Sequence, residues 1–371
     1  MTGKWRFGWL IIFCFYIFWD APEASANNPG NSFFYKAEAA AHFGFVWPHD
    51  PDLDNLYTGF FPFFQVSVSG TTRGNEPWHH WYNFPDLGFT FMFADLNYPD
   101  VLGRAFSLWP HISFTLFQGS SVNLHLRYGV GIGYLDNWYR EQENEENMAI
   151  SAPLNIAMNT ALKAGFAVSE NFFLHGGIGM THFSNGRTRT PNKGLNIPSA
   201  QLELTYQFQP RPPLPERRKD FSEPDKYGLS LYLAGGYNEL YPPGGSKYPE
   251  FTLSSTLNRS LSLKSRVGLG ADVFWGLSDK AVLSRKDQKP DGQFKLLKPG
   301  IHLSYEQVFS NTSFIVHQGL YLYARQDEDG RTYNRAGFRH YLGDRFQINL
   351  TIKSHLFRAD FVEWGMGYRL F

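Results

Sequence analysis

The chain is nearly free of cysteine. Its one thiol, Cys14, lies in the apolar stretch 8–19 near the N-terminus. Lys4 and Arg6 precede this stretch and Ala24-Ser25-Ala26 follows it, which is typical of a secretory signal peptide with an A-x-A cleavage site. We therefore predict cleavage after residue 26 and a mature chain without a thiol. Such a chain has no disulfide, no cysteine metal site and no cysteine nucleophile.

Long hydrophobic runs and net charge are also lacking. The apolar stretch 8–19 is short for a membrane-spanning helix, which needs about 20 residues, and this argues against the alternative of a retained membrane anchor. Basic and acidic residues balance at 34 each, so no basic surface indicates nucleic acid as a partner. Aromatic residues make up 18% of the chain although its mean hydropathy is only −0.35. This combination favours membrane strands that alternate apolar and polar residues between aromatic girdles.

A period of two dominates the sequence after residue 33. In 122–134, Val, Leu, Tyr and Ile alternate with Asn, His, Arg and Gly. One face of such a strand suits lipid, and the other suits a narrow polar lumen. Ordinary strands run about five or six residues and membrane strands about nine to eleven, so the length indicates a membrane strand.

The same alternation predicts eight strands in each half of the chain. In the first half we expect them near 35–47, 57–70, 84–96, 106–118, 121–135, 156–169, 171–184 and 196–208. In the second half we expect them near 227–239, 248–260, 262–276, 294–308, 312–324, 331–342, 344–356 and 359–371. Pro62 and Pro110 weaken two of these predictions, because proline cannot donate to a sheet ladder.

These elements predict an all-β protein, a transmembrane antiparallel β-barrel of two eight-stranded units in tandem. The expected parts are a signal peptide (1–26), a first barrel (27–208), a Pro-rich linker (209–226) and a second barrel unit (227–371). Both halves end on phenylalanine, as outer-membrane barrels commonly do. The alternative is one 16-stranded barrel, which also has an even strand number and no free edge. Sixteen strands would leave an aqueous channel, whereas eight fill their own lumen.

Two short polar blocks carry the candidate chemistry. The first is Thr181-His182-Phe183-Ser184-Asn185-Gly186, and the second is Pro191-Asn192-Lys193-Gly194-Leu195-Asn196. His182 and Ser184 share one face of a strand and lie about 7 Å apart along the backbone. The other side chains on that face of the strand are apolar. An unpaired polar group facing hydrocarbon costs several kcal/mol. A Ser–His pair that attacks a lipid ester would explain them. The alternative is that the strand has left the membrane and both are wetted turn residues.

The two blocks together resemble the active-site segment of the outer-membrane lipid A 3-O-deacylases and their acyloxyacyl-hydrolase-like relatives. The resemblance covers roughly residues 33–208. It implies an eight-stranded barrel with a Ser-His-Glu triad on its outer face, which removes an ester-linked acyl chain from lipid A. It also implies a role for each matching residue: His182 as general base, Ser184 as nucleophile, Asn185 at the oxyanion site, and Asn192 and Gly194 in support.

One position departs from the resembled family. Asn196 stands where the family has its triad glutamate. An amide oxygen can still orient an imidazole, but it brings no charge to stabilise the imidazolium. Glu203 is the nearest acid in the following strand, and its parity places it in the lumen. The candidate catalytic set is therefore His182, Ser184 and Asn196.

Two functions follow from these observations. The first is an esterase of the bacterial outer membrane, acting on lipid A or lipopolysaccharide after signal-peptide cleavage, without a metal or redox cofactor. The second is a non-catalytic barrel, structural or a pore, that keeps the fold. The acidic run 140–147 lacks the spacing of metal ligands and is interpreted as a solvated loop. The acyl position cleaved, the oligomeric state and the role of residues 227–371 stay open.

Overall fold

The computed structural model describes residues 34–209 and much of the remaining chain. After residue 209 it describes 216–371 except 217, 219–220, 222–223, 289–291, 293–295, 326–329 and 357. The predicted signal peptide, 1–26, and its cleavage site lie outside the described residues. Among the described residues, no helix is long and apolar enough to cross a membrane.

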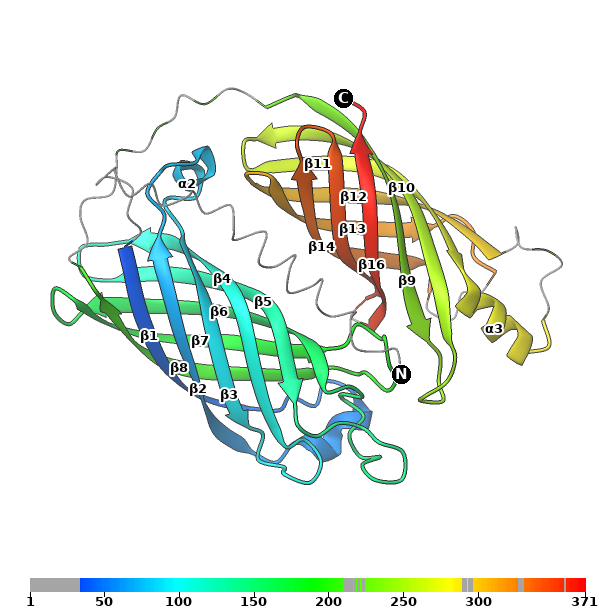
Figure 1. The fold of residues 1–371 in the computed structure, drawn as a ribbon, viewed down its shortest axis with the longest axis horizontal. Coiled ribbons are helices and arrows are strands. Elements are labelled where there is room, and N and C mark those ends of the chain that lie inside the picture. The colour runs from blue at the N-terminus through cyan, green and yellow to red at the C-terminus, as the bar shows by residue number, and fades with distance from the viewer. Residues whose placement is uncertain are drawn as a thin grey trace. The chain divides into compact units, whose positions relative to one another are not determined.

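The strands form two closed antiparallel barrels of eight strands each (Figure 1). The first barrel runs from blue to green in Figure 1, and β8 pairs with β1, from Lys36 opposite Gln207 to Gly44 opposite Ser199. In the second barrel β16 pairs with β9. The fold class is thus confirmed. The alternative of one 16-stranded barrel is wrong, because each set of eight strands already uses both of its edges.

All sixteen strands lie near their predicted positions, with ends that differ by a few residues. The first barrel consists of β1 (Phe34–Phe45), β2 (Phe60–Thr71), β3 (Asp86–Asp95), β4 (Arg104–Gln118), β5 (Asn123–Leu135), β6 (Leu154–Ala167), β7 (Phe172–Ser184) and β8 (Leu195–Gln207). The second consists of β9 (Tyr227–Glu239), β10 (Lys247–Ser262), β11 (Ser265–Gly276), β12 (Leu297–Phe309), β13 (Thr312–Tyr321), β14 (Thr332–Leu342), β15 (Phe346–His355) and β16 (Arg358–Arg369). Among the residues that the structure describes, three short helices lie in loops: η1 (Pro51–Leu56), α2 (Pro77–Trp81) and α3 (Leu277–Arg285).

The predicted alternation separates lumen from outer surface. In β5, Arg127 is 3% exposed and the adjacent Tyr128 is 44% exposed. The two prolines that weakened strand predictions do lie in strands, Pro62 in β2 and Pro110 in β4. Pro110 pairs with β3 through Phe89, but the ladder between β4 and β5 omits it, in keeping with its missing N–H.

The lumen of the first barrel holds a buried cluster of two cations and two carboxylates. Arg127 Nη2 lies 2.5 Å from Glu38 Oε2, and Lys163 Nζ lies 2.5 Å from Glu203 Oε1. Arg127 Nη1 also lies 3.5 Å from Glu203 Oε2 and joins the two pairs. The charges balance, which is what allows ionised groups to be buried. Glu203 thus faces the lumen, as its parity predicted.

An apolar core fills the end of this barrel where β7 stops and β8 starts. Phe183, Leu195 and Ile197 point into it, and Leu53 and Leu56 of η1 pack there as well. Because side chains alternate along a strand, the neighbours His182, Ser184 and Asn196 point to the outer surface. Packing of these apolar side chains in the core therefore turns the candidate-site side chains toward the outer surface.

The acidic run 140–147 is more ordered than predicted. Its four glutamates, 141, 143, 145 and 146, are exposed, but Asn144 and Asn147 are buried. Both side chains donate 2.9 Å hydrogen bonds to the carbonyl oxygen of Val101. The prediction of a solvated loop is thus right for the carboxylates and wrong for these amides, which hold the loop to its neighbour.

The lumen of the second barrel also contains paired charges. Arg335 Nε lies 2.6 Å from Glu363 Oε2, and Arg335 Nη1 lies 3.4 Å from Asp272 Oδ1. His302 Nδ1 lies 2.7 Å from Asp272 Oδ2, and its Nε2 lies 3.0 Å from Thr256 Oγ1. This Asp–His–Thr series has the residue types of a nucleophile and its base, but it is buried in the lumen. We interpret it as part of the packing of the barrel.

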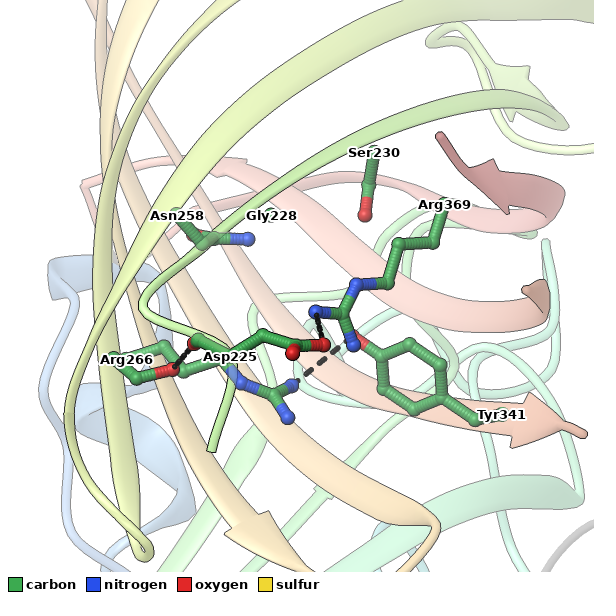
Figure 2. Close-up of a pocket in the computed structure, with 8 residues that line it drawn as sticks. Asp225, Gly228, Ser230, Asn258, Arg266, Tyr341 and Arg369 are labelled. Atoms are coloured by element: carbon green, nitrogen blue, oxygen red, sulfur yellow. Dashed lines mark hydrogen bonds and ion pairs between the residues drawn. The ribbon is translucent and has the colours of Figure 1, made fainter. Parts of the chain in front are cut away.

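A small pocket lies at the end of the second barrel where β9 begins and β16 ends (Figure 2). Arg369 Nη2 lies 2.8 Å from Asp225 Oδ2, and Arg266 Nη1 lies 2.9 Å from Glu306 Oε1. Tyr341 donates a further 3.1 Å hydrogen bond to Glu306. Both guanidinium groups in this pocket thus already have carboxylate partners. We interpret these contacts as closing the barrel end.

Candidate active site

Strand pairing brings the candidate base and its partner together. His182 of β7 lies directly opposite Asn196 of β8. His182 Nδ1 is 2.6 Å from Asn196 Oδ1. An amide oxygen can only accept, so the imidazole donates this hydrogen bond through Nδ1. Asn196 therefore occupies a position from which its amide oxygen can orient His182.

Ser184 lies in the last position of β7, opposite Ile156 of β6. Strand β7 continues through both polar residues, so they are strand residues rather than turn residues. Asn192 Nδ2 donates to Ser184 Oγ over 2.8 Å, and Asn192 Oδ1 accepts from the backbone N–H of Asn185 over 3.1 Å. The outward-facing serine is only 8% exposed. One asparagine thus ties the serine hydroxyl to the backbone that follows it.

Asn185 is buried beside the site rather than presented at its surface. Its side-chain Nδ2 donates to Ser151 Oγ over 3.1 Å, and the residue is 1% exposed. The side-chain amide thus links β7 to the loop before β6. A role for Asn185 at the oxyanion site stays a prediction, and its backbone and side chain are separate candidates for that role.

Sequence reasoning missed the residues that come to the site from distant loops. His49, in the loop after β1, has Nδ1 3.0 Å from Asn196 Nδ2 and Nε2 3.1 Å from the carbonyl oxygen of Lys193. The Lys193 ammonium in turn lies 2.9 Å from Asp50 Oδ2. Hydrogen-bonded to Asp50, it holds the pKa of that carboxyl below its usual range. Alternation gives no signal for these residues, because they lie outside strands.

No metal centre accompanies this arrangement in the part of the chain that the structure describes. Groups of three or more His, Cys, Asp or Glu side chains arranged to hold a metal ion are absent among the described residues.

Gly194 sits against the imidazole. Its φ is +84°, and a Cβ built there would lie 2.8 Å from His182 Cε1. Its N–H donates to the carbonyl oxygen of Ala149 over 3.0 Å, so the backbone cannot easily withdraw. Only glycine satisfies both the left-handed conformation and the close approach.

We expect Gly194→Ala to lower the rate of any reaction that uses His182 by about tenfold or more, because the methyl group must displace the imidazole. Gly59→Ala is the matched control. Gly59 also has a positive φ, of +92°, but nothing lies within 4 Å of its Cβ position. Gly59→Ala therefore measures the cost of backbone strain, about 1–3 kcal/mol, without any contact to an imidazole. Steady-state rates and urea unfolding of both variants test this, and equal rates in the two variants would contradict it.

Comparisons with known proteins agree with these barrels. Residues 63–206 match the family described as lipid A 3-O-deacylase (PagL), and residues 227–371 match acyloxyacyl hydrolase, C-terminal domain. No curated protein sequence matches the chain. The second family match is new, since the predicted resemblance stopped near residue 208.

Solved structures similar to the chain have low identity. One is Neisserial surface protein A (NspA), with 15% identity, a TM-score of 0.32, and coverage of 48% of this chain and 99% of that one. Another is the outer membrane enzyme PagL, with 15% identity, a TM-score of 0.27, and coverage of 45% and 97%. The two family matches fall on the two barrels in turn. Residues 63–206, in the first barrel, are thus similar to the lipid A 3-O-deacylase family, and residues 227–371, the second barrel, are similar to the acyloxyacyl hydrolase C-terminal domain.

Proposed function

We propose that this protein is an outer-membrane esterase that removes an ester-linked acyl chain from lipid A. The carrying observation is the 2.6 Å contact between His182 Nδ1 and Asn196 Oδ1, on the outer face of a barrel whose family deacylates lipid A. The proposed substrate bond is the 3-O ester that the family description names. We also propose export by signal-peptide cleavage after Ala26.

The proposed reaction starts at Ser184 and uses His182 as its base. With its hydrogen on Nδ1, His182 keeps a lone pair on Nε2 to take the hydroxyl proton as Ser184 Oγ attacks the ester carbonyl. Collapse of the tetrahedral intermediate breaks the bond to the sugar oxygen, which leaves with the proton from His182. Water, deprotonated by the same imidazole, then hydrolyses the acyl-serine and releases the fatty acid.

Asn192 and Asn196 have separate parts in this proposal. Asn192 holds the Ser184 hydroxyl in place through its 2.8 Å hydrogen bond. Asn196 orients His182 but carries no charge, so the imidazolium formed during attack is stabilised less than beside a carboxylate. We therefore expect a slower esterase than a member with glutamate at this position.

The second candidate function is a barrel that keeps the family fold without the chemistry. The uncharged Asn196 is the observation that favours it. Its structural version fits both barrels. Its pore version fits them less well, because an eight-stranded barrel fills its lumen with its own side chains.

Mass spectrometry of lipid A from cells with and without the protein tests the proposed function. We expect a lipid A species lighter by one acyl chain only where the protein is present, together with the released fatty acid. The purified full-length protein should produce the same change in detergent-dispersed lipid A. Unchanged lipid A in both experiments would favour the non-catalytic barrel.

A further inference from the structure

Because Asn196 has an amide in place of a carboxylate, the orientation of its side chain matters at the proposed triad. A carboxylate offers an acceptor at either oxygen, so it serves the imidazole equally in both orientations. An amide has one acceptor and one donor end. With its oxygen toward His182, Asn196 keeps the hydrogen on Nδ1 and leaves Nε2 free as a base. With its nitrogen toward His182, the amide would place the imidazole hydrogen on Nε2, where it cannot receive the serine proton.

The far end of the Asn196 amide meets His49. Asn196 Nδ2 lies 3.0 Å from His49 Nδ1, and His49 Nε2 lies 3.1 Å from the carbonyl oxygen of Lys193. The carbonyl can only accept, so it draws the His49 hydrogen to Nε2 and leaves a lone pair on Nδ1. That lone pair accepts from the Asn196 NH₂ group. The amide oxygen then faces His182, at the observed 2.6 Å.

A competing contact of His49 would favour the other tautomer of its imidazole. Its Nδ1 also lies 3.1 Å from the carbonyl oxygen of Trp47. A hydrogen on Nδ1 would satisfy that carbonyl, but it would oppose the Asn196 NH₂ group and leave Nε2 without a hydrogen for Lys193. The first arrangement makes two hydrogen bonds at His49 and the second makes one. The backbone around His49 therefore favours the tautomer that suits the proposed base.

We propose that His49 is a positioning residue, which fixes the direction of the Asn196 amide and thereby keeps the His182 hydrogen on Nδ1. This inference rests on the proposed function for its catalytic consequence, although the tautomer of His182 can be measured without any reaction. His49 touches no reacting atom in this scheme. It acts only through Asn196, and it is needed only because residue 196 is an amide.

A double-mutant cycle on the full-length protein tests this dependence. In the natural background, His49→Ala should lower kcat on detergent-dispersed lipid A by about 10- to 100-fold with little change in KM, because part of the population has the wrong tautomer. In the Asn196→Asp background, His49→Ala should change kcat by less than about threefold, because a carboxylate has no wrong end. His49→Asn, which can place an amide oxygen near the position of Nδ1, should restore part of the rate. An equal loss in both backgrounds would overturn the proposal.

The second measurement is ¹⁵N NMR of histidine-labelled protein in detergent. In the natural chain His182 should have its hydrogen on Nδ1, and in His49→Ala a substantial fraction should move to Nε2. A His182 tautomer that is unchanged in His49→Ala would also overturn the proposal. Asp54→Ala is the control in the same loop, because Asp54 is exposed in η1. It should leave both kcat and the His182 spectrum unchanged.

The two proposals fail in different ways. If neither the natural chain nor Asn196→Asp deacylates lipid A, the proposed function fails, and the tautomer measurement still decides the role of His49. If both are active and His49→Ala has no effect in the natural background, only the role of His49 fails. Heat-modifiable migration of each variant shows that its barrels are folded in every arm.

Discussion

Replacement of Ser184 or His182 by alanine should abolish lipid A deacylation, with a fall in kcat of about 10³-fold or more for each single variant. Ser184 supplies the attacking oxygen and His182 accepts its proton, so neither works without the other. The double variant should be hardly slower than either single one, because residues that act as a unit are not additive. Deacylation of purified lipid A, followed by mass spectrometry, measures this.

The same barrel contains a matched control for a serine beside a histidine. His42 Nδ1 lies 3.2 Å from Ser199 Oγ, and His42 is buried. Ser199 has the inward parity of Glu203 in β8, so no lipid ester reaches it. Ser199→Ala should keep full activity while Ser184→Ala loses it. Full activity of a folded Ser184→Ala protein would end the esterase mechanism and leave the non-catalytic barrel as the better interpretation.

The second large effect concerns stability rather than chemistry. Arg127→Met should lower the free energy of unfolding of the first barrel by about 3–5 kcal/mol. The substitution leaves Glu38 and Glu203 buried with Lys163 as the only remaining cation of the cluster. A buried charge without its partner is more costly than the pair itself. Urea unfolding in lipid vesicles measures the change.

Arg104→Met is the matched control, because Arg104 also pairs with a carboxylate but at the surface. Its Nε lies 2.8 Å from Asp136 Oδ2, and its side chain is 57% exposed. An exposed ion pair contributes about 0–1 kcal/mol, so the control should unfold almost as the natural chain does. Equal destabilisation by both substitutions would show that the lumen cluster is not the cause. Below its unfolding transition Arg127→Met should still deacylate lipid A, because Arg127 lies in the lumen.

Much of the fold was predictable because a membrane strand repeats every two residues. The alternation located all sixteen strands and assigned Arg127 and Tyr128 to opposite faces. Strand ends were less well predicted. The second strand was predicted to begin at residue 57, yet β2 begins only at Phe60, after Tyr57, Thr58 and Gly59. Periodicity reports the interior of a strand, and the hydrogen bonds of neighbouring strands decide where it stops.

The candidate site was predictable in part for the same reason. Parity placed His182 and Ser184 on the outer face and Glu203 in the lumen, and the motif indicated Asn196 as the third member. The contact of Asn192 with Ser184, and of Asn185 with Ser151, depends on how loops fold back over the strand ends. Loop conformation follows no period, so the residues that support the site could not be ranked from the sequence.

The amino-acid pattern therefore specifies strands, faces and the identity of the polar pair, since all three depend on neighbours close in the chain. It does not specify which strands close the sheet. The choice between two barrels and one is made by pairing of β8 with β1, strands about 160 residues apart, and only the assembled sheet decides it. The same holds for His49, which meets Asn196 across 147 positions. Contacts of that separation depend on the closed barrel, because only closure brings β1 and its following loop beside β8.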